Sequence, residues 1–359
     1  MSLLARSTRG ITLAHVRHVT PVPPGRATGT VARVYHDMER EFGMLAPPIA
    51  LHAPAPDALA GAWVVFRETM LPSVAASRAA KETVAAAVSL ANRCPYCVDV
   101  HGATLDGLTT GGDARALAAG RLGEMTDPAM RALARWARRD GGPVPFPGSG
   151  AQLPELVATA VVFAYLNRMV NVFLRDSPLP PLTGLAAGLA RRGAARVMGR
   201  LARGRARPGA SLGLLPGPAA AGPAWAAGQP HIAGALAGAT AALETAAEPH
   251  VAAPVRAVVS GLLDGGAAGP WNGGAAGPWN GGAAAGPWND GGAVASLPAA
   301  LRPAGRLAML TALASYRVTD AVVEEARSSG LNDAGLVRLT AWASWSAARR
   351  TGAELASVR

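Results

Sequence analysis

The stretch from Glu82 to Leu105, ETVAAAVSLANRCPYCVDVHGATL, contains the most informative chemistry of the sequence. It holds both cysteines of the chain, Cys94 and Cys97, and His101 follows the second cysteine by four positions. The run before the cysteines is rich in alanine and has apolar residues at helical spacing, so it predicts a helix. A second helix is expected to begin at Cys94, because the proline that follows it is well tolerated in a first helical turn.

The second helix would place the two cysteines and the histidine on one face. His101 lies four residues after Cys97 and seven after Cys94, and both separations return to the same side of a helix. Free backbone N–H groups in a first helical turn stabilise negative charge, so we expect the pKa of the thiols to fall. A histidine one turn from a thiol can accept its proton near neutral pH.

A carboxylate completes this candidate site. Glu82 lies twelve residues before Cys94, on the preceding predicted helix. If the two helices pack as a hairpin, the carboxylate can reach the histidine and relay protons. The two cysteines, at positions i and i+3, can form a disulfide after one of them is oxidised.

The same residues permit other interpretations. Two cysteines and one nearby histidine leave a zinc site one ligand short, and the chain has no second CxxC motif, so we expect no metal. Cys-Pro-Tyr-Cys also occurs in glutaredoxins, but that thioredoxin-like fold needs a β-strand where this chain has a helical run. Taken alone, the cysteines can be buried small hydrophobic residues of a non-catalytic helical protein that binds a partner or senses redox state.

The composition favours an all-α fold. Half of the 359 residues are apolar, mostly because alanine is abundant, and aromatic residues are few. Frequent glycine and proline indicate several loops. We predict five regions: a loosely packed N-terminal arm at 1–30, a helical domain with the CxxC site at 31–182, an Arg/Ala-rich helical and Gly/Pro-rich region at 183–264, a GGAAGPWN repeat insertion without assigned chemistry at 265–292, and C-terminal helices at 293–359.

The charge is strongly basic, but no binding motif accompanies it. The net charge is +11, and nearly all of the positive charge comes from arginine. No aromatic residues alternate with the arginines and no nucleic-acid motif is present, so we expect no nucleic-acid partner. The densest run predicts a solvated helix face and comprises Arg191, Arg192, Arg196, Arg200, Arg203, Arg205 and Arg207.

The sequence also favours a cytoplasmic location. The N-terminal residues lack the apolar core of a signal peptide, and no uninterrupted stretch of about 20 apolar residues predicts a membrane-spanning helix. Two cysteines three positions apart cannot stabilise a secreted fold of this size. In a cytoplasmic protein, a CxxC pair typically serves redox or metal chemistry.

Glu82, the run Cys94-Pro95-Tyr96-Cys97 and His101 together resemble the motif E-x11-C-x-x-C-x3-H of the AhpD-like alkylhydroperoxidase family, which belongs to the carboxymuconolactone decarboxylase superfamily. The segment from Tyr165 to Asn171 is also similar to some members. The resemblance covers roughly residues 30–180 and implies an AhpD-like helical bundle there. The sequence pattern beyond it predicts a longer C-terminal helical half interrupted by glycine and proline. One hypothesis for that half is a degenerate second copy of the helical unit.

The resemblance implies a thiol-dependent peroxidase that reduces alkyl hydroperoxides. Cys97 would be the peroxidatic nucleophile, Cys94 would resolve its sulfenic acid to a disulfide, and His101 with Glu82 would relay protons. Founding members have a histidine where this chain has Tyr96, so a simpler relay is expected.

The resemblance also implies which partners and cofactors to expect. The family uses no bound metal, haem or other cofactor, and its members are usually homo-oligomers, as trimers or hexamers. Their disulfide is reduced by an external dithiol on a lipoylated or thioredoxin-like protein. A general dithiol–disulfide oxidoreductase is the alternative enzyme.

Overall fold

A computed structural model describes residues 9–10, 12–139, 142, 144–177, 184–204, 206–216, 221–267 and 292–358. Residues 268–291, which hold most of the predicted repeat insertion, lie outside this set, as does Arg205. The interpretation of the repeat therefore stays a prediction.

The predicted all-α fold is confirmed for the described residues, which form helices and one isolated β-bridge between Val16 and Leu174 but no strand. The α-helices are α2 (Gly29–Glu41), α3 (Pro47–Ala50), α4 (Pro56–Met70), α5 (Arg78–Ala91), α6 (Pro95–Leu108), α7 (Asp113–Ala118), α8 (Pro128–Arg138), α9 (Leu153–Phe173), α10 (Gly184–Ala202), α11 (Pro230–Ala247), α12 (Ala253–Leu262), α13 (Arg302–Ala314), α14 (Asp320–Ser328) and α15 (Asp333–Ser357). Short 3-10 and π turns connect several of them.

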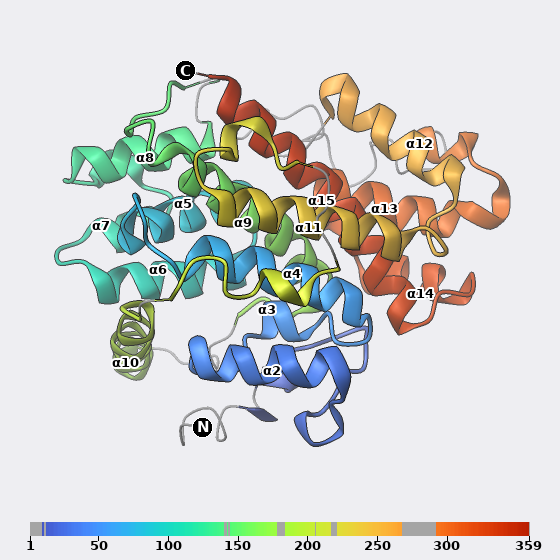
Figure 1. The fold of residues 1–359 in the computed structure, drawn as a ribbon, viewed down its shortest axis with the longest axis horizontal. Coiled ribbons are helices and arrows are strands. Elements are labelled where there is room, and N and C mark those ends of the chain that lie inside the picture. The colour runs from blue at the N-terminus through green and yellow to red at the C-terminus, as the bar shows by residue number, and fades with distance from the viewer. Residues whose placement is uncertain are drawn as a thin grey trace.

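Helix α9 is the centre of the fold (Figure 1). All of its residues except Leu153 and Asn171 are buried, because the helix is apolar on every side and other helices surround it. It is the one described helix long and apolar enough to cross a membrane, but 94% of its most apolar window is buried inside the protein. Its composition therefore fits the core helix of this bundle.

Helices α5 and α6 form the predicted hairpin beside α9. The side chain of Ser77 caps α5 by accepting a hydrogen bond from the backbone N–H of Ala80. The turn between the helices passes through Arg93, which adopts the left-handed conformation with φ of 51°. Pro95 then opens α6 with Cys94 at the N-cap, as the sequence predicted.

The C-terminal helices pack directly against the helices that carry the motif. Helix α15 runs along α9, and α13 packs on α15 (Figure 1). Buried apolar side chains from Val19 to Leu355 form one continuous hydrophobic cluster. The N-terminal half of the bundle therefore owes part of its core to residues that lie far along the chain.

Some described residues of the predicted N-terminal arm make specific contacts with the bundle. Thr12 is 1% exposed and donates its hydroxyl hydrogen bond to the carbonyl of Leu45. The backbone N–H of Arg17 binds the carbonyl of Phe173 at 2.8 Å, at the end of the core helix. The arm is polar and rich in proline, yet these backbone contacts fix it to the bundle.

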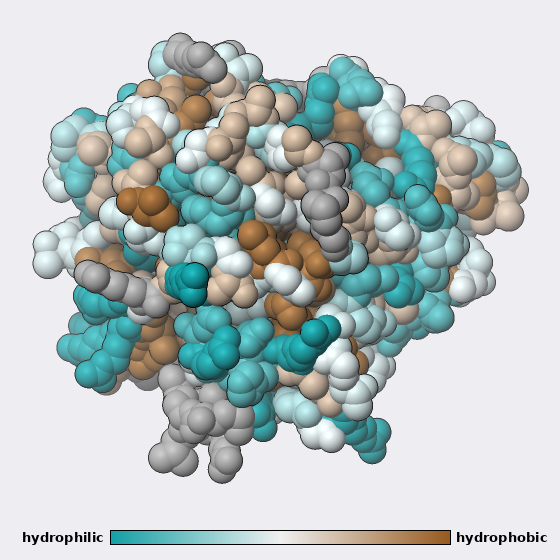
Figure 2. Space-filling model, in the orientation of Figure 1, coloured by the Kyte–Doolittle hydropathy of each residue, from teal (hydrophilic) through white to brown (hydrophobic). Residues whose placement is uncertain are grey.

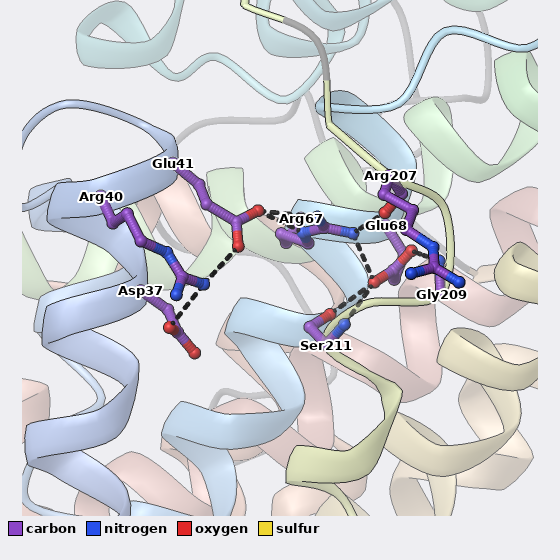
Figure 3. A network of polar contacts seen from close by, with 8 residues as sticks. All are labelled: Asp37, Arg40, Glu41, Arg67, Glu68, Arg207, Gly209 and Ser211. Carbon is purple, nitrogen blue, oxygen red and sulfur yellow. Dashed lines mark hydrogen bonds and ion pairs between the residues drawn. The ribbon is translucent and has the colours of Figure 1, made fainter.

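A polar network fixes the chain that leaves α10 (Figure 3). Arg67 of α4 is buried, pairs with Glu41 at 2.7 Å and donates to the backbone carbonyl of Arg207 at 2.6 Å. The neighbouring Glu68 accepts hydrogen bonds from the backbone N–H and the hydroxyl of Ser211, at 2.9 and 2.7 Å. The segment that follows α10 is therefore held against α4.

Candidate functional site

The two cysteines meet at the start of α6. Their Sγ atoms lie 2.8 Å apart, and both are free thiols. Cys94 is completely buried, and its backbone N–H donates to the carbonyl of Ser89 at 3.0 Å, which closes the turn. Cys97 is 3% exposed and borders a pocket. A single disulfide can form here after only a small movement, since the sulfur atoms are already in contact.

The predicted carboxylate and histidine also meet. His101 Nδ1 lies 2.7 Å from Glu82 Oε2, and Arg78 Nε donates to Glu82 Oε1 at 2.7 Å. Arg78 was not predicted as part of the site, although it lies four residues before Glu82 on the same helix, the spacing of helical ion pairs. Among the described residues, Nε2 of His101 makes no hydrogen bond, so this nitrogen can exchange a proton with a group in the pocket.

Burial and charge act differently on the two sides of the site. Burial alone would raise the pKa of Glu82, but the charges of Arg78 and His101 and their hydrogen bonds outweigh it, so its pKa is lowered. Burial raises the pKa of Cys94 well above its ordinary value, and contact with Cys97 raises it further. The expectation that the helix N-terminus lowers both thiol pKa values is therefore wrong for Cys94, because desolvation outweighs the helix dipole.

A buried polar network lies beneath the CxxC turn. Asn167 of α9 donates to Ser89 Oγ at 3.0 Å and accepts from the amide of Asn92 at 3.1 Å. Arg168 donates to Asn92 Oδ1 at 3.2 Å. These side chains come from the 165–171 segment and from the end of α5, so the network ties both to the turn that presents the cysteines. A satisfied network of this kind holds a local geometry rigidly.

The pocket beside Cys97 has a volume of about 210 Å³ and an almost wholly apolar lining. Tyr96, Cys97 and His101 form one wall, and the ring of Phe163 meets the His101 ring edge-on with centroids 4.3 Å apart. The remaining lining residues come from several elements: Thr12, His15, Phe42, Met44, Ala46, Pro47, Pro48, Ile49, Phe66, Asp99, Val100, Ala103, Leu166, Ala194 and Met198. An apolar small molecule therefore has access to Cys97 and His101 together.

The sequence did not reveal most of this pocket. His15 is not among the predicted site residues, but it lines the pocket and packs edge-on against Tyr96, with ring centroids 6.1 Å apart. Ala194 and Met198 reach the pocket from α10, nearly one hundred residues after Cys97. Apolar residues like these resemble any core position in a sequence, so no local signal marked them.

Comparison with known proteins covers far more of the chain than the motif does. The chain is 38% identical over 340 residues to the alkyl hydroperoxide reductase Rv2159c of Mycobacterium tuberculosis, and the match spans 94% of each chain. It therefore includes the C-terminal helices, where the sequence alone showed no resemblance. No protein-family model matches the chain, and no solved structure gives a significant match. The chain belongs to the AhpD-like alkyl hydroperoxide reductase family of peroxidase-type oxidoreductases.

Proposed function

We propose that this protein reduces organic hydroperoxides through a dithiol–disulfide cycle of Cys97 and Cys94. The observation that supports it most strongly is the shared pocket, in which Cys97 and a histidine held by a buried carboxylate face the same apolar space. The name of its relative from Mycobacterium tuberculosis supports the same reaction.

In the first step, the Cys97 thiolate attacks the terminal oxygen of the peroxide. The O–O bond breaks, Cys97 becomes a sulfenic acid, and the alkoxide leaves with a proton as an alcohol. His101 holds the proton taken from the thiol and returns it to the leaving oxygen. Glu82 accepts from Nδ1–H, which leaves Nε2 as the basic nitrogen and stabilises the charge of the protonated ring.

In the second step, Cys94 attacks the sulfenic sulfur, a disulfide forms and water leaves. The raised pKa keeps Cys94 as a neutral thiol until then, so Cys97 is the residue that meets peroxide first. An external dithiol then reduces the disulfide and is itself oxidised to a disulfide. The family resemblance supports a lipoylated or thioredoxin-like donor and a homo-oligomeric assembly. The cysteine usage of the chain supports a cytoplasmic location, where thiols are kept reduced.

The lining of the pocket supports an organic substrate. Its walls offer few hydrogen-bond partners apart from the catalytic groups, so hydrogen peroxide gains little from binding there. An alkyl or aryl group instead removes apolar surface from water on both sides of the contact. We therefore expect tert-butyl or cumene hydroperoxide to react faster than hydrogen peroxide.

Single-turnover oxidation tests the proposal. The reduced protein is mixed with cumene hydroperoxide, and free thiols are counted over time. We expect rapid loss of two thiols in the natural protein, no rapid loss in Cys97→Ser, and one sulfenylation without further cycling in Cys94→Ser. Loss no faster than that of an ordinary exposed thiol would show that peroxide is not the substrate. In that case rapid exchange with protein dithiols would identify a general disulfide oxidoreductase.

A further inference from the structure

A groove lined by arginine lies on the other side of the contact between α6 and α10. Its residues are Asp106, Gly107, Arg192, Ala195, Arg196, Arg200 and Arg203. The helices touch closely here, since a Cβ atom on Gly107 would lie 2.0 Å from the carbonyl oxygen of Ala195. Arg203 also donates to the carbonyl of Gly107 at 2.8 Å. These contacts fix α10 against α6, so the groove has a defined shape.

The positive charge of the groove is not neutralised by the protein. Among the described residues, Arg192, Arg196 and Arg200 make no hydrogen bond and no ion pair. Asp106 is the one acidic residue that lines the groove, and it is 4.0 Å from Arg115. Like charges at positions i and i+4 destabilise a helix. A solvated face, as predicted from sequence, does not explain why three such charges converge on a concave surface.

The extent of the arginine row indicates what it can bind. From Arg192 to Arg203 the row spans eleven residues, or about 16 Å along the helix axis. That length exceeds a single phosphate and matches a row of carboxylates on a protein surface. No aromatic side chain lines the groove, so it offers no platform on which nucleic-acid bases can stack. Guanidinium groups bind carboxylates strongly and in fixed geometry.

The same helix faces the reaction site. Ala194 and Met198 of α10 line the apolar pocket, while the arginine row occupies a different face of α10. Figure 2 shows hydrophilic residues next to a hydrophobic patch where Figure 1 places α10, at the lower left. A protein bound at the groove therefore lies next to the wall of the pocket that holds Cys97.

We propose that the arginine groove of α10 is the docking surface for an acidic protein, the dithiol donor that reduces the Cys94–Cys97 disulfide. This inference rests on the proposed function, which requires an external dithiol. Opposite charges increase the rate at which two proteins meet, and the increase falls with ionic strength. The donor would be recognised through a row of Asp and Glu side chains, and its dithiol would then reach the disulfide.

The test uses full-length protein that has been oxidised to the disulfide with diamide, so it does not depend on peroxide chemistry. Two synthetic peptides carry the same CxxC dithiol, flanked either by glutamates or by glutamines. Reduction rates are measured by stopped flow at low and high salt. The variant Arg192→Gln/Arg196→Gln/Arg200→Gln is compared with Arg26→Gln/Arg33→Gln/Arg135→Gln, which removes three exposed arginines outside the groove.

At low salt we expect the glutamate peptide to reduce the natural protein about tenfold faster than the glutamine peptide. That advantage should disappear in the groove variant and at high salt, and should persist in the control variant. An advantage that survives in the groove variant, or no advantage in the natural protein, would overturn the proposal. So would binding of DNA or anionic vesicles that depends on the three arginines without any effect of the glutamate peptide. If the diamide-treated protein contains no disulfide that dithiothreitol can reduce, the proposed dithiol–disulfide cycle is wrong. That result would count against the proposed function and not against the docking surface.

Discussion

Two buried carboxylates, Glu82 and Glu155, each form an ion pair with a cation of α5, but their surroundings differ. Glu82 of α5 contacts Arg78 and His101 and stands behind the wall of the pocket. Glu155 of α9 pairs with Lys81, the residue directly before Glu82, and also accepts from the backbone N–H of Ala76 at 3.2 Å. Both are 0% exposed, and both pKa values are lowered, since nearby cations outweigh the effect of burial.

The difference shows that a buried, charged pair does not by itself mark a reaction site. The partners of Glu155 are an ammonium group, backbone donors and the side-chain amide of Gln229, which fix the chain and do not line the pocket of Cys97. The partner of Glu82 is the imidazole of His101, which lines the pocket and has a second nitrogen that can accept or donate a proton. We therefore propose proton transfer for Glu82 and a structural role for Glu155.

Replacement of Glu82 should produce the largest effect on reaction rate. Glu82→Gln keeps the shape of the side chain but removes the negative charge that orients and stabilises protonated His101. We expect the rate of thiol oxidation by cumene hydroperoxide to fall by about 100-fold or more. Stopped-flow measurement of thiol loss checks this, with circular dichroism to confirm the fold. An unchanged rate in a folded variant would remove Glu82 from the relay.

Replacement of Glu155 should mainly affect stability. Glu155→Gln leaves the ammonium of Lys81 buried without its counter-charge, which should cost about 3–5 kcal/mol in unfolding free energy. The double variant Lys81→Met/Glu155→Gln should recover much of this loss. Urea unfolding measures both, and Glu354→Gln, which breaks a partly exposed pair with Arg139, is a control expected to cost about 1 kcal/mol or less.

The activity of the folded Glu155→Gln fraction separates the two roles further. We expect it to oxidise at nearly the natural rate, because the carboxylate of Glu155 contacts Lys81 and backbone N–H groups, whereas that of Glu82 contacts His101. If its rate fell as far as that of Glu82→Gln without a loss of stability, the distinction between the two carboxylates would be wrong.

The relative placement of the site residues was predictable from sequence, because helix periodicity depends only on residues that are close together in the chain. The spacing of Cys94, Cys97 and His101 was sufficient to place them on one helix face, and the hairpin brought Glu82 to the histidine as expected. All-α architecture followed from alanine content in the same way.

The pocket and the role of the C-terminal half were not predictable, because they depend on contacts between distant parts of the chain. Met198 and His15 line the pocket beside Cys97 only because α10 and the N-terminal arm pack there. The raised pKa of Cys94 likewise depends on its complete burial, which the local helix N-terminus does not reveal. The family resemblance carried by the motif ends near residue 180, whereas the match to the known relative continues through the C-terminal helices.

Acid should weaken the fold through both carboxylates. The folded pKa values of Glu82 and Glu155 lie below the unfolded value of about 4.3, so the stability they provide is complete above that value. It is lost as the pH falls through the folded pKa values, when protons bind to the unfolded chain more readily. We expect the unfolding free energy in urea to decline below about pH 5. The decline should be shallower in Lys81→Met/Glu155→Gln, and an equal slope would contradict the assignment.

The smallest effect should come from the wall of the pocket. Met198→Gln keeps the length of the side chain but places an amide where an apolar substrate binds, so we expect kcat/KM for cumene hydroperoxide to fall by about fivefold, or about 1 kcal/mol. Hydrogen peroxide, which has no apolar group, should be affected less. Val197→Gln is the matched control, since Val197 is 43% exposed on the same helix and does not line the pocket. Equal losses for both peroxides would show that Met198 supports the position of α10 instead of selecting the substrate.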